Sequence, residues 1–440
     1  MKNKHIITLV SLVASTSIFS QSFNSEKLNQ YFENLETNNK FMGSVALSKN
    51  GKLIYTKTIG FADVATKQKT NENTKYRIGS ISKTFTTVLV LKAIDKNKLN
   101  LNDKLSKFYP NIINAEKITI QMLLNHRSGI FNFTDGNSYY EWNTQAKTEK
   151  DLLEIIAKNG SDFEPDTKTS YSNSNFVLLS FILQKVFKKD YSALLKEYIT
   201  TPLNLKNTYF GGKINPKNNE AKSYLPKNNE WKEEAETDMS IPLGAGGIES
   251  TPSDLVAFSN ALFGGKLVSE KDLDFMKTIK DGIGNGLFQF PFYDFKGYGH
   301  TGGIDGFTSS FTHFDQDDVS FALTSNASNY NNNNIAIAVL SAVYNKDFEI
   351  PNFKIYQVKP EELNQYIGTY SSPQIPLKIT ISVKDNVLMA QATGQNAFPL
   401  DASEKDVFRF DKVGVVLEFK PTEKKMTLKQ GGGEFNFMKE

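Results

Sequence analysis

The stretch Tyr76–Phe85, YRIGSISKTF, decides how the rest of the chain is interpreted. It continues into the apolar run TTVLVLKAI, so the pattern predicts a buried helix that begins near Ser80. Ser80 and Lys83 are three residues apart and therefore share one face of that helix. A core helix gains nothing from a lysine on its packing side. The pair is therefore either a capping serine with a snorkelling lysine, or a hydroxyl and an amine that act together.

The second interpretation has a definite chemistry. A desolvated lysine loses its proton more easily and can act as a base toward a serine hydroxyl. Gly79 permits a tight turn before the helix, where backbone N–H groups lack helical partners. The N–H of Ser80 could therefore donate to a developing oxyanion. This segment alone leaves the two interpretations equal.

A second segment of interest is FEPDTKTSYSNSNF, which leads into the apolar helical run FVLLSFILQKVF. A phenol such as Tyr171 can shuttle a proton beside a lysine amine, and a carboxamide such as Asn173 can hold a substrate amide. The alternative is an ordinary helix cap, with Tyr171 as a hydrophobic staple. In isolation the cap is the better interpretation.

The third segment is GYGHTGGIDGF, residues 297–307, which is strand-like on both sides. His300 and Thr301 stand directly before Gly302 and Gly303. Glycines in a strand let a substrate backbone approach closely and leave an N–H free to donate. A glycine-rich turn explains the same residues, and alone it is slightly favoured.

Taken together, the three segments resemble the penicillin-recognising serine hydrolases, which include class C β-lactamases, DD-carboxypeptidases, D-aminopeptidases and related esterases. Ser80-Ile-Ser-Lys83 is similar to their Ser-x-x-Lys, Tyr171-Ser-Asn173 to Tyr-x-Asn, and His300-Thr301-Gly302 to Lys/His-Thr/Ser-Gly. Three further stretches support the resemblance over about residues 25–345: LLNHRSGI, FEPDTKTSYSN with Asp166 in the place of the usual glycine, and GAGGIESTPSDLVAF.

The resemblance implies an α+β chain with the β-lactamase-like/DD-peptidase fold, an antiparallel sheet flanked by helices plus a helical region. It implies that Ser80 is acylated, that Lys83 takes its proton, that Tyr171 assists and that Asn173 orients the substrate. The oxyanion donors would be the backbone N–H groups of Ser80 and Gly303, with Thr301 and Gly302 on the same substrate-binding strand. His126 fits a structural role. No cofactor and no metal are expected.

The third motif opens with His300 rather than with lysine. This matters because a neutral imidazole holds a substrate carboxylate less strongly than the ammonium of a lysine does. We therefore predict a serine hydrolase that acts through an acyl-enzyme on amide or ester bonds, in peptides that contain D-amino acids, in peptidoglycan-type peptides or in small esters. Two alternatives stay open: a non-catalytic penicillin- or peptidoglycan-binding protein, and a true class C-type β-lactamase. The partner is a small-molecule or peptide substrate, cell-wall peptides included.

The pattern predicts a helix over 26–36, a hairpin turning at Asn50–Gly51, and a polar loop at Asn331–Asn334. The aromatic-rich stretches 131–143 and 288–298 are interpreted as core rather than as pocket walls. From residue 351 a linker leads into short alternating strands, which indicate a small all-β unit, either a sandwich or a lipocalin-like barrel. We expect three parts: a signal peptide over 1–20, a β-lactamase-like serine hydrolase domain over 21–350, and a C-terminal β-barrel accessory domain over 351–440.

Residues 1–20 have a basic start, an apolar run over 6–19 and a small-residue cleavage site. A run of that length is shorter than the ~20 residues of a spanning helix, so we predict a signal peptide and a periplasmic or secreted protein with no stable membrane anchor after cleavage. The 51 basic and 48 acidic residues nearly balance, which gives no reason to expect nucleic acid as a partner. The chain has no cysteine, which excludes disulfides, thiolate metal ligands and a cysteine nucleophile.

Overall fold

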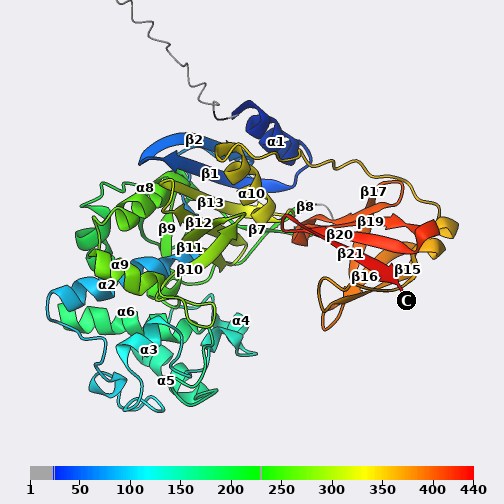
Figure 1. Ribbon diagram of the computed structural model, residues 1–440. Helices are drawn as coiled ribbons and strands as arrows, with labels where there is room; N and C mark the ends of the chain where they lie inside the picture. Colours follow the sequence, from blue (N-terminus) through cyan, green and yellow to red (C-terminus); the bar gives the residue numbers. More distant parts are fainter. Residues whose placement is uncertain (1–22, 24, 228–229) are drawn as a thin grey trace, which may run out of the picture.

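The computed structural model of the protein describes residues 23, 25–227 and 230–440 (Figure 1). The expected signal peptide lies outside the described residues. A larger body contains a central antiparallel sheet and a helical region, and a smaller all-β unit follows at the C-terminal end (Figure 1). This is the α+β, β-lactamase-like arrangement that the sequence predicts. No helix in the described ranges combines the length and the apolar character that a membrane crossing requires.

The central sheet has six strands in the spatial order β10-β11-β12-β13-β1-β2, and every neighbouring pair is antiparallel. Their bounds are β1 Phe41–Lys49, β2 Lys52–Ile59, β10 Phe288–Phe292, β11 Phe295–Ile304, β12 Phe307–Phe314 and β13 Val319–Ser328. The predicted hairpin joins β1 to β2. Asn50 and Gly51 at its turn both have positive φ, +53° and +68°, which suits a two-residue turn between twisted strands.

Helices cover both faces of this sheet. One face packs against α1 (Ser25–Thr37) and α10 (Asn332–Val343) through a cluster of buried apolar residues, and α8 (Pro252–Phe263) lies on the other face against β1, β12 and β13. The predicted helix over 26–36 is therefore confirmed. The polar tract is not a loop throughout, because Asn331 caps α10 by accepting from the Asn333 N–H and the helix begins at Asn332.

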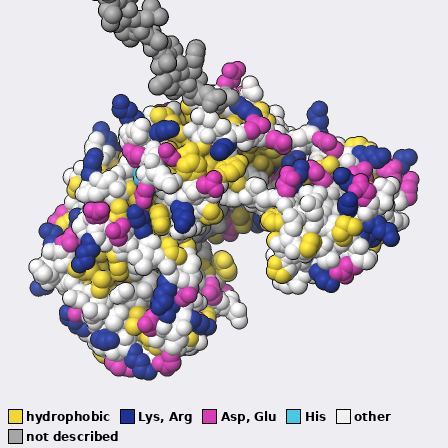
Figure 2. Space-filling model, viewed as in Figure 1, with side chains coloured by type: hydrophobic (Ala, Val, Ile, Leu, Met, Phe, Trp, Pro, Cys, Tyr) yellow, Lys and Arg dark blue, Asp and Glu magenta, His cyan; other side chains and the backbone are white. Residues whose placement is uncertain are grey.

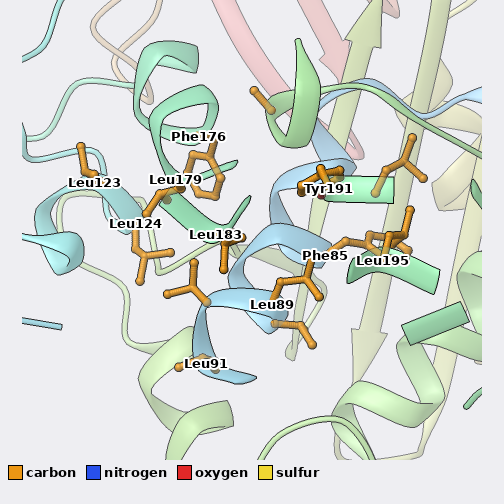
Figure 3. Packing of buried hydrophobic residues seen from close by; sticks show 14 of the residues in the cluster. Phe85, Leu89, Leu91, Leu123, Leu124, Phe176, Leu179, Leu183, Tyr191 and Leu195 are labelled. Atoms are coloured by element: carbon orange, nitrogen blue, oxygen red, sulfur yellow. The ribbon is translucent and has the colours of Figure 1, made fainter. Parts of the chain in front are cut away.

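The helical region is built around α2 (Ser82–Asp95) and α6 (Asn173–Phe187). The other helices of the body are α3 Ile120–Leu124, α4 Tyr139–Trp142, α5 Glu149–Asn159, α7 Tyr191–Leu195 and α9 Glu270–Lys277, and its short strands are β3 Phe61–Asp63, β4 Gln68–Lys69, β5 Tyr76–Arg77, β6 Tyr209–Phe210, β7 Tyr224–Lys227, β8 Glu230–Glu233 and β9 Ile248–Ser250. Figure 3 shows side chains of α2, among them Phe85 and Leu89, packed among Phe176 and Leu183 of α6. This packing holds the start of α2 next to the start of α6.

The C-terminal unit is a closed barrel of eight antiparallel strands in chain order. The strands are β14 Gly368–Ser371, β15 Lys378–Lys384, β16 Val387–Ala392, β17 Phe398–Glu404, β18 Val407–Phe410, β19 Val415–Lys420, β20 Lys425–Gln430 and β21 Gly433–Lys439, and β21 pairs with β14 to close the ring. Buried residues alternate along the strands, as Ile379 and Ile381 do on β15. Of the two all-β forms the sequence allowed, the structure has the barrel. The boundary at residue 350 stays a prediction.

Candidate active site

Ser80 lies in the short 3-10 turn η1 (Gly79–Ile81), and Lys83 lies in the first turn of α2 directly after it. Gly79 has a φ of +49°, a left-handed conformation that glycine adopts without strain. A side chain at Gly79 would also collide with the backbone of Gly303, since an added Cβ would lie 2.7 Å from the Gly303 nitrogen. Glycine at 79 therefore lets the Ser80 turn touch β11.

The amine of Lys83 is fully buried and has three oxygen neighbours. Its Nζ lies 2.9 Å from Ser80 Oγ, 2.7 Å from Asn173 Oδ1 and 2.7 Å from the carbonyl oxygen of Ala245. No carboxylate among the described residues forms an ion pair with it. Burial lowers the pKa of Lys83 well below its usual value.

A neutral amine fits this environment. It has two N–H donors and one lone pair, while the Ala245 carbonyl and the Asn173 amide oxygen can only accept. Both N–H groups are used by these two acceptors, so the lone pair is left facing the Ser80 hydroxyl. A neutral Lys83 in this arrangement can accept a proton from Ser80.

Asn173 is the first residue of α6, and two neighbours fix its amide group. Its backbone N–H donates to Asn132 Oδ1 at 2.9 Å, and its Nδ2 donates to Thr134 Oγ1 at 3.0 Å. Because Nδ2 is the donor to Thr134, Oδ1 is the atom that faces Lys83. Asn173 thus positions the amine as well as lining the cleft.

Tyr171 lies between Lys83 and the ring of His126. Lys83 Nζ is 4.9 Å from the centre of the Tyr171 ring, and the phenol hydrogen-bonds the Ser80 side chain. Burial raises the pKa of Tyr171 far above its usual range, despite this hydrogen bond. The structure favours a neutral phenol beside a neutral amine, because burial penalises both charged forms.

His126 holds the segment that carries Tyr171. Its Nδ1 accepts the Ser172 N–H at 3.0 Å, and its ring stacks on the Tyr171 ring with centres 4.4 Å apart. Burial lowers the pKa of His126 well below 6.5, with a further contribution from Lys83, so the ring is neutral and can accept. This is a structural role of the kind that the sequence predicts for His126.

The loop before Tyr171 is fixed by Arg127, which is almost completely buried. Its guanidinium binds the Asp166 carboxylate, the Thr169 hydroxyl at 2.9 Å and the Asp281 carboxylate at 2.8 Å. Asp166 has a φ of +65°. The backbone at that position is therefore left-handed, a conformation that glycine adopts without strain and that aspartate tolerates, and the arginine contact holds the loop in place.

The third segment forms the half of β11 that has no partner on its outer edge, since β10 pairs only as far as Gly299. Gly303 lies against Gly79 and lines the same cleft as Ser80. Gly302 is equally close-packed, because an added Cβ would lie 2.0 Å from the Ile78 carbonyl oxygen. Thr301 is exposed and lines a neighbouring hollow instead of the cleft.

His300 points away from solvent, toward Tyr171 and Phe288. Its ring centre is 6.5 Å from that of Tyr171 and 4.7 Å from that of Phe288, and its Nδ1 lies 2.6 Å from the Thr301 carbonyl oxygen. Burial, with a contribution from Lys83, lowers the pKa of His300 to about 3. His300 is therefore buried and neutral, so it supplies no cation for a substrate carboxylate.

The cleft that contains Ser80 has a volume of about 740 Å³. Phe133, Tyr139 and Tyr140 line it, so part of the aromatic stretch 131–143 forms pocket wall, where sequence reasoning expected core. The charged residues that line the cleft are all acidic: Asp135, Glu234 and Asp305. Asp305 is paired with the buried Arg77, whereas Asp135 and Glu234 have no ion pair within the described part of the chain.

Sequence reasoning missed several residues of the site. The stretch GAGGIESTPSDLVAF supports the family resemblance, but nothing in it indicates that the Ala245 carbonyl oxygen reaches Lys83. No sequence pattern indicates Asn132 or Thr134, because they contribute only by accepting hydrogen bonds from Asn173 in the folded chain. Phe288 lies in an aromatic stretch that was interpreted as core, and it contacts the rings of Tyr171 and His300.

The family model described as Beta-lactamase matches residues 28–349. The teichoic acid D-alanine hydrolase of Staphylococcus aureus is 29% identical over 247 residues, which are 56% of this chain and 59% of that protein. This chain spans about three fifths of the length of the curated relatives it matches.

Two solved structures extend the comparison. The D-amino acid amidase from Ochrobactrum anthropi SV3, complexed with D-phenylalanine, superposes with a TM-score of 0.64 at 25% identity and covers 72% of this chain and 99% of that one. The octameric penicillin-binding protein homologue from Pyrococcus abyssi has a TM-score of 0.66 at 22% identity, with 94% of this chain and 99% of that one covered. The second likeness concerns the fold alone, and it extends over most of the barrel.

Proposed function

The chain belongs to the Beta-lactamase family, and on that basis we propose that it is a serine hydrolase that cleaves amide or ester bonds through an acyl-enzyme on Ser80. The observation that carries the proposal is the environment of Lys83. Its Nζ lies 2.7 Å from two atoms that can only accept, Asn173 Oδ1 and the Ala245 carbonyl oxygen, and 2.9 Å from Ser80 Oγ. A neutral amine that donates to the first two therefore presents its lone pair to Ser80. A protein that only binds a ligand has no need for such a base beside a hydroxyl.

In the proposed reaction the Ser80 proton moves to Lys83 Nζ while Oγ attacks the substrate carbonyl carbon. The resulting oxyanion accepts from the backbone N–H groups of Ser80 and Gly303. Tyr171, a neutral phenol bonded to Ser80, returns a proton to the leaving amine or alkoxide as the carbonyl–heteroatom bond breaks. Lys83 then passes the proton it took from Ser80 to the Tyr171 phenolate, so that both groups are neutral again. Water attacks the ester on Ser80 and gives a proton to Lys83, which returns it to Ser80 Oγ as the acyl bond breaks and the acid is released.

The proposed acyl group is a D-aminoacyl group with a free ammonium. The Staphylococcus aureus and Ochrobactrum anthropi relatives are named for D-alanine and D-amino acid substrates. In this chain the cleft carries the unpaired carboxylates of Asp135 and Glu234, which attract a cation. No arginine or lysine is among the described residues that line it. Since His300 is neutral as well, a substrate with a free carboxylate in this cleft is disfavoured, which weighs against a class C-type β-lactamase.

The test uses the methyl ester and the amide of D-alanine and of L-alanine. We expect turnover of the D forms, an acyl adduct on Ser80 by intact-mass spectrometry at short times, and loss of both in Ser80→Ala. Nitrocefin should be hydrolysed slowly or not at all. A Ser80→Ala variant that keeps esterase activity would show that Ser80 is not the nucleophile. Unchanged binding of cell-wall peptides with no turnover of any ester would favour the binding-protein alternative.

Export, with residues 1–20 as a signal peptide and a periplasmic or secreted location, is part of the same proposal. A substrate in the cell envelope, such as the D-alanyl ester named for the Staphylococcus aureus relative, requires an enzyme outside the cytoplasm. Mass spectrometry of the protein from culture fractions, with the N-terminus identified, checks the location and the cleavage site together. A full-length chain confined to the cytoplasmic fraction would contradict it.

A further inference from the structure

A second hollow, of about 430 Å³, opens next to the catalytic cleft. Thr308 lines both spaces, and Thr301 and Gly302 line the hollow directly before Gly303, which lines the cleft. Residues of β10, β11, β12, β13 and α10 line the hollow, and Lys412 of the barrel adds to its wall. A substrate held at Ser80 could therefore extend into it without leaving the protein surface.

The hollow has two chemically different ends. Its inner wall is apolar and includes Phe290, Phe314 and Leu340. Its rim is polar, and the one charged side chain on it, within the described residues, is Lys412 of the barrel. A volume of this size lies in the range of small-molecule sites, and apolar walls with one placed charge are typical of them.

The barrel holds Lys412 at this place through its neighbour Asp411. The Asp411 carboxylate forms ion pairs with Lys40 at 2.8 Å and with Arg409 at 2.9 Å, and its carbonyl oxygen accepts the N–H of Asn331 at 2.9 Å. Gly414, with a φ of +68°, closes the turn against Asn331 and Asn334. Because Asp411 already has two cationic partners, it does not neutralise Lys412, whose amine is exposed and has no ion pair among the described residues.

Both parts of the protein are needed to form this hollow, since the apolar wall comes from the larger body and the charge from the barrel. The space-filling view shows the barrel joined to the body at their upper contact, with an open gap beneath it (Figure 2). The contact that includes Asp411 and α10 therefore fixes the distance of the barrel from the sheet. The barrel therefore contributes to substrate selection, because the larger body alone provides no charged side chain in the hollow among the described residues.

We propose that this hollow is a distal substrate subsite for a group with an apolar stem and an anionic end, a carboxylate or a phosphate, and that Lys412 is its specificity-determining residue. The inference rests on the proposed function, because it takes the group in the hollow to be part of the molecule whose carbonyl lies at Ser80. The proposal supplies a cation for a substrate anion, which the residues lining the cleft do not provide. A cation for a substrate anion is absent at His300 and present on the barrel, at Lys412.

Binding is tested first, without turnover, in the Ser80→Ala enzyme. Calorimetric titration with hexyl phosphate, hexanoate and hexanol should show the two anions binding more tightly than the alcohol. Lys412→Glu should weaken the anions by about tenfold and leave hexanol unchanged, a loss of about 1.4 kcal/mol by the usual conversion. Lys405→Glu, an exposed barrel lysine away from the hollow, is the charge-matched control and should change nothing. An effect on one anion only identifies it as the natural end group.

Turnover is tested second, with D-alanyl esters of hexanol and of 6-hydroxyhexyl phosphate beside D-alanine methyl ester. Lys412→Glu should raise KM for the phosphate ester alone. Ala336→Phe, which places a ring in the apolar end, should lower kcat/KM for both long esters and spare the methyl ester. Equal effects on all three esters, or no difference between anions and hexanol in the titration, would overturn the subsite. Failure of the methyl ester to react would count against the proposed function instead, since the titration does not depend on it.

Discussion

Lys83 donates to the carbonyl oxygen of Ala245, 162 residues further along the chain, at 2.7 Å. That bond and the bond to Asn173 use both N–H groups of a neutral amine, and they leave its lone pair for Ser80. Burial favours the same neutral form. In the proposed reaction, activation of the serine depends on the protonation state of this one lysine.

Lys83→Arg and Lys83→Met should both abolish acylation, by about a thousandfold or more, because a guanidinium stays protonated at any working pH and a thioether has no basic nitrogen. In the wild type the rate of acylation should rise with pH through an apparent pKa below ~10.4. Single-turnover kinetics with a D-alanyl ester between pH 5 and 10 measure both. Near-native acylation by Lys83→Arg would mean that another group is the base.

The low pKa of Lys83 should also be visible in folding. Between that value and the usual lysine value, the unfolded chain binds a proton that the folded chain does not, so the free energy of unfolding should increase with pH over this interval. Lys83→Met should remove from that slope the contribution of the one proton that Lys83 binds in the unfolded chain. Urea unfolding at several pH values from 7 to 10 measures the slope in both proteins. Equal slopes would show that Lys83 is charged in the folded enzyme.

Asn173→Asp should place a carboxylate 2.7 Å from Lys83 Nζ, where an amide oxygen now stands. The negative charge should raise the pKa of Lys83, so acylation at pH 7 should fall by about ten- to a hundredfold and recover at higher pH. The pH–rate profile separates this from simple damage. A loss that is equal at every pH would contradict the electrostatic explanation.

Gly302→Ala and Gly303→Ala form a matched pair on β11. A Cβ at 302 would lie 2.0 Å from the Ile78 carbonyl oxygen, whereas at 303 the nearest atom is 4.0 Å away. Gly302→Ala should push β11 from the Ser80 turn, with a fall in kcat of at least tenfold and a loss of stability of about 1–3 kcal/mol. Gly303→Ala keeps its backbone N–H and should stay close to the wild type in stability. Thermal unfolding measures the stability of both variants, and ester kinetics measure their kcat.

His300 should make the fold sensitive to acid. Its pKa is about 3 in the folded chain and ~6.5 when unfolded, so the unfolded chain binds the extra proton between these values and stability falls as pH is lowered through them. The contribution to the slope is up to ~1.4 kcal/mol per pH unit. His300→Gln should reduce the slope between pH 6.5 and 4, measured by urea unfolding, while Thr301→Val should leave it unchanged.

His126→Phe retains a ring against Tyr171 but loses the acceptor for the buried Ser172 N–H. We expect a loss of stability of about 1–3 kcal/mol from the unpaired donor. His126→Leu removes the stacked ring as well and should lower kcat further, with KM little changed. If both variants act on the D-alanyl ester like the wild type, Tyr171 does not depend on His126 for its position.

Several features could be predicted from the sequence because they depend on near neighbours in the chain. Ser80 and Lys83 share a helix face by their spacing, Asn50–Gly51 suits the left-handed turn that it forms, and alternation along short strands indicated the C-terminal all-β unit. The order of the three motifs identified the family and hence the sheet. Local backbone geometry and periodicity suffice for such features.

Other features depend on contacts between distant segments. Tertiary packing decided that Lys83 is neutral and that Tyr171 stays a phenol, because a pKa follows the burial created by the whole core and not the identity of adjacent residues. The same holds for the Ala245 acceptor, for the inward position of His300, and for Lys412, which the barrel places beside the sheet. The sequence alone indicated which residues are candidates for the chemistry, while the tertiary structure shifts their pKa values, since only the folded chain excludes water from them.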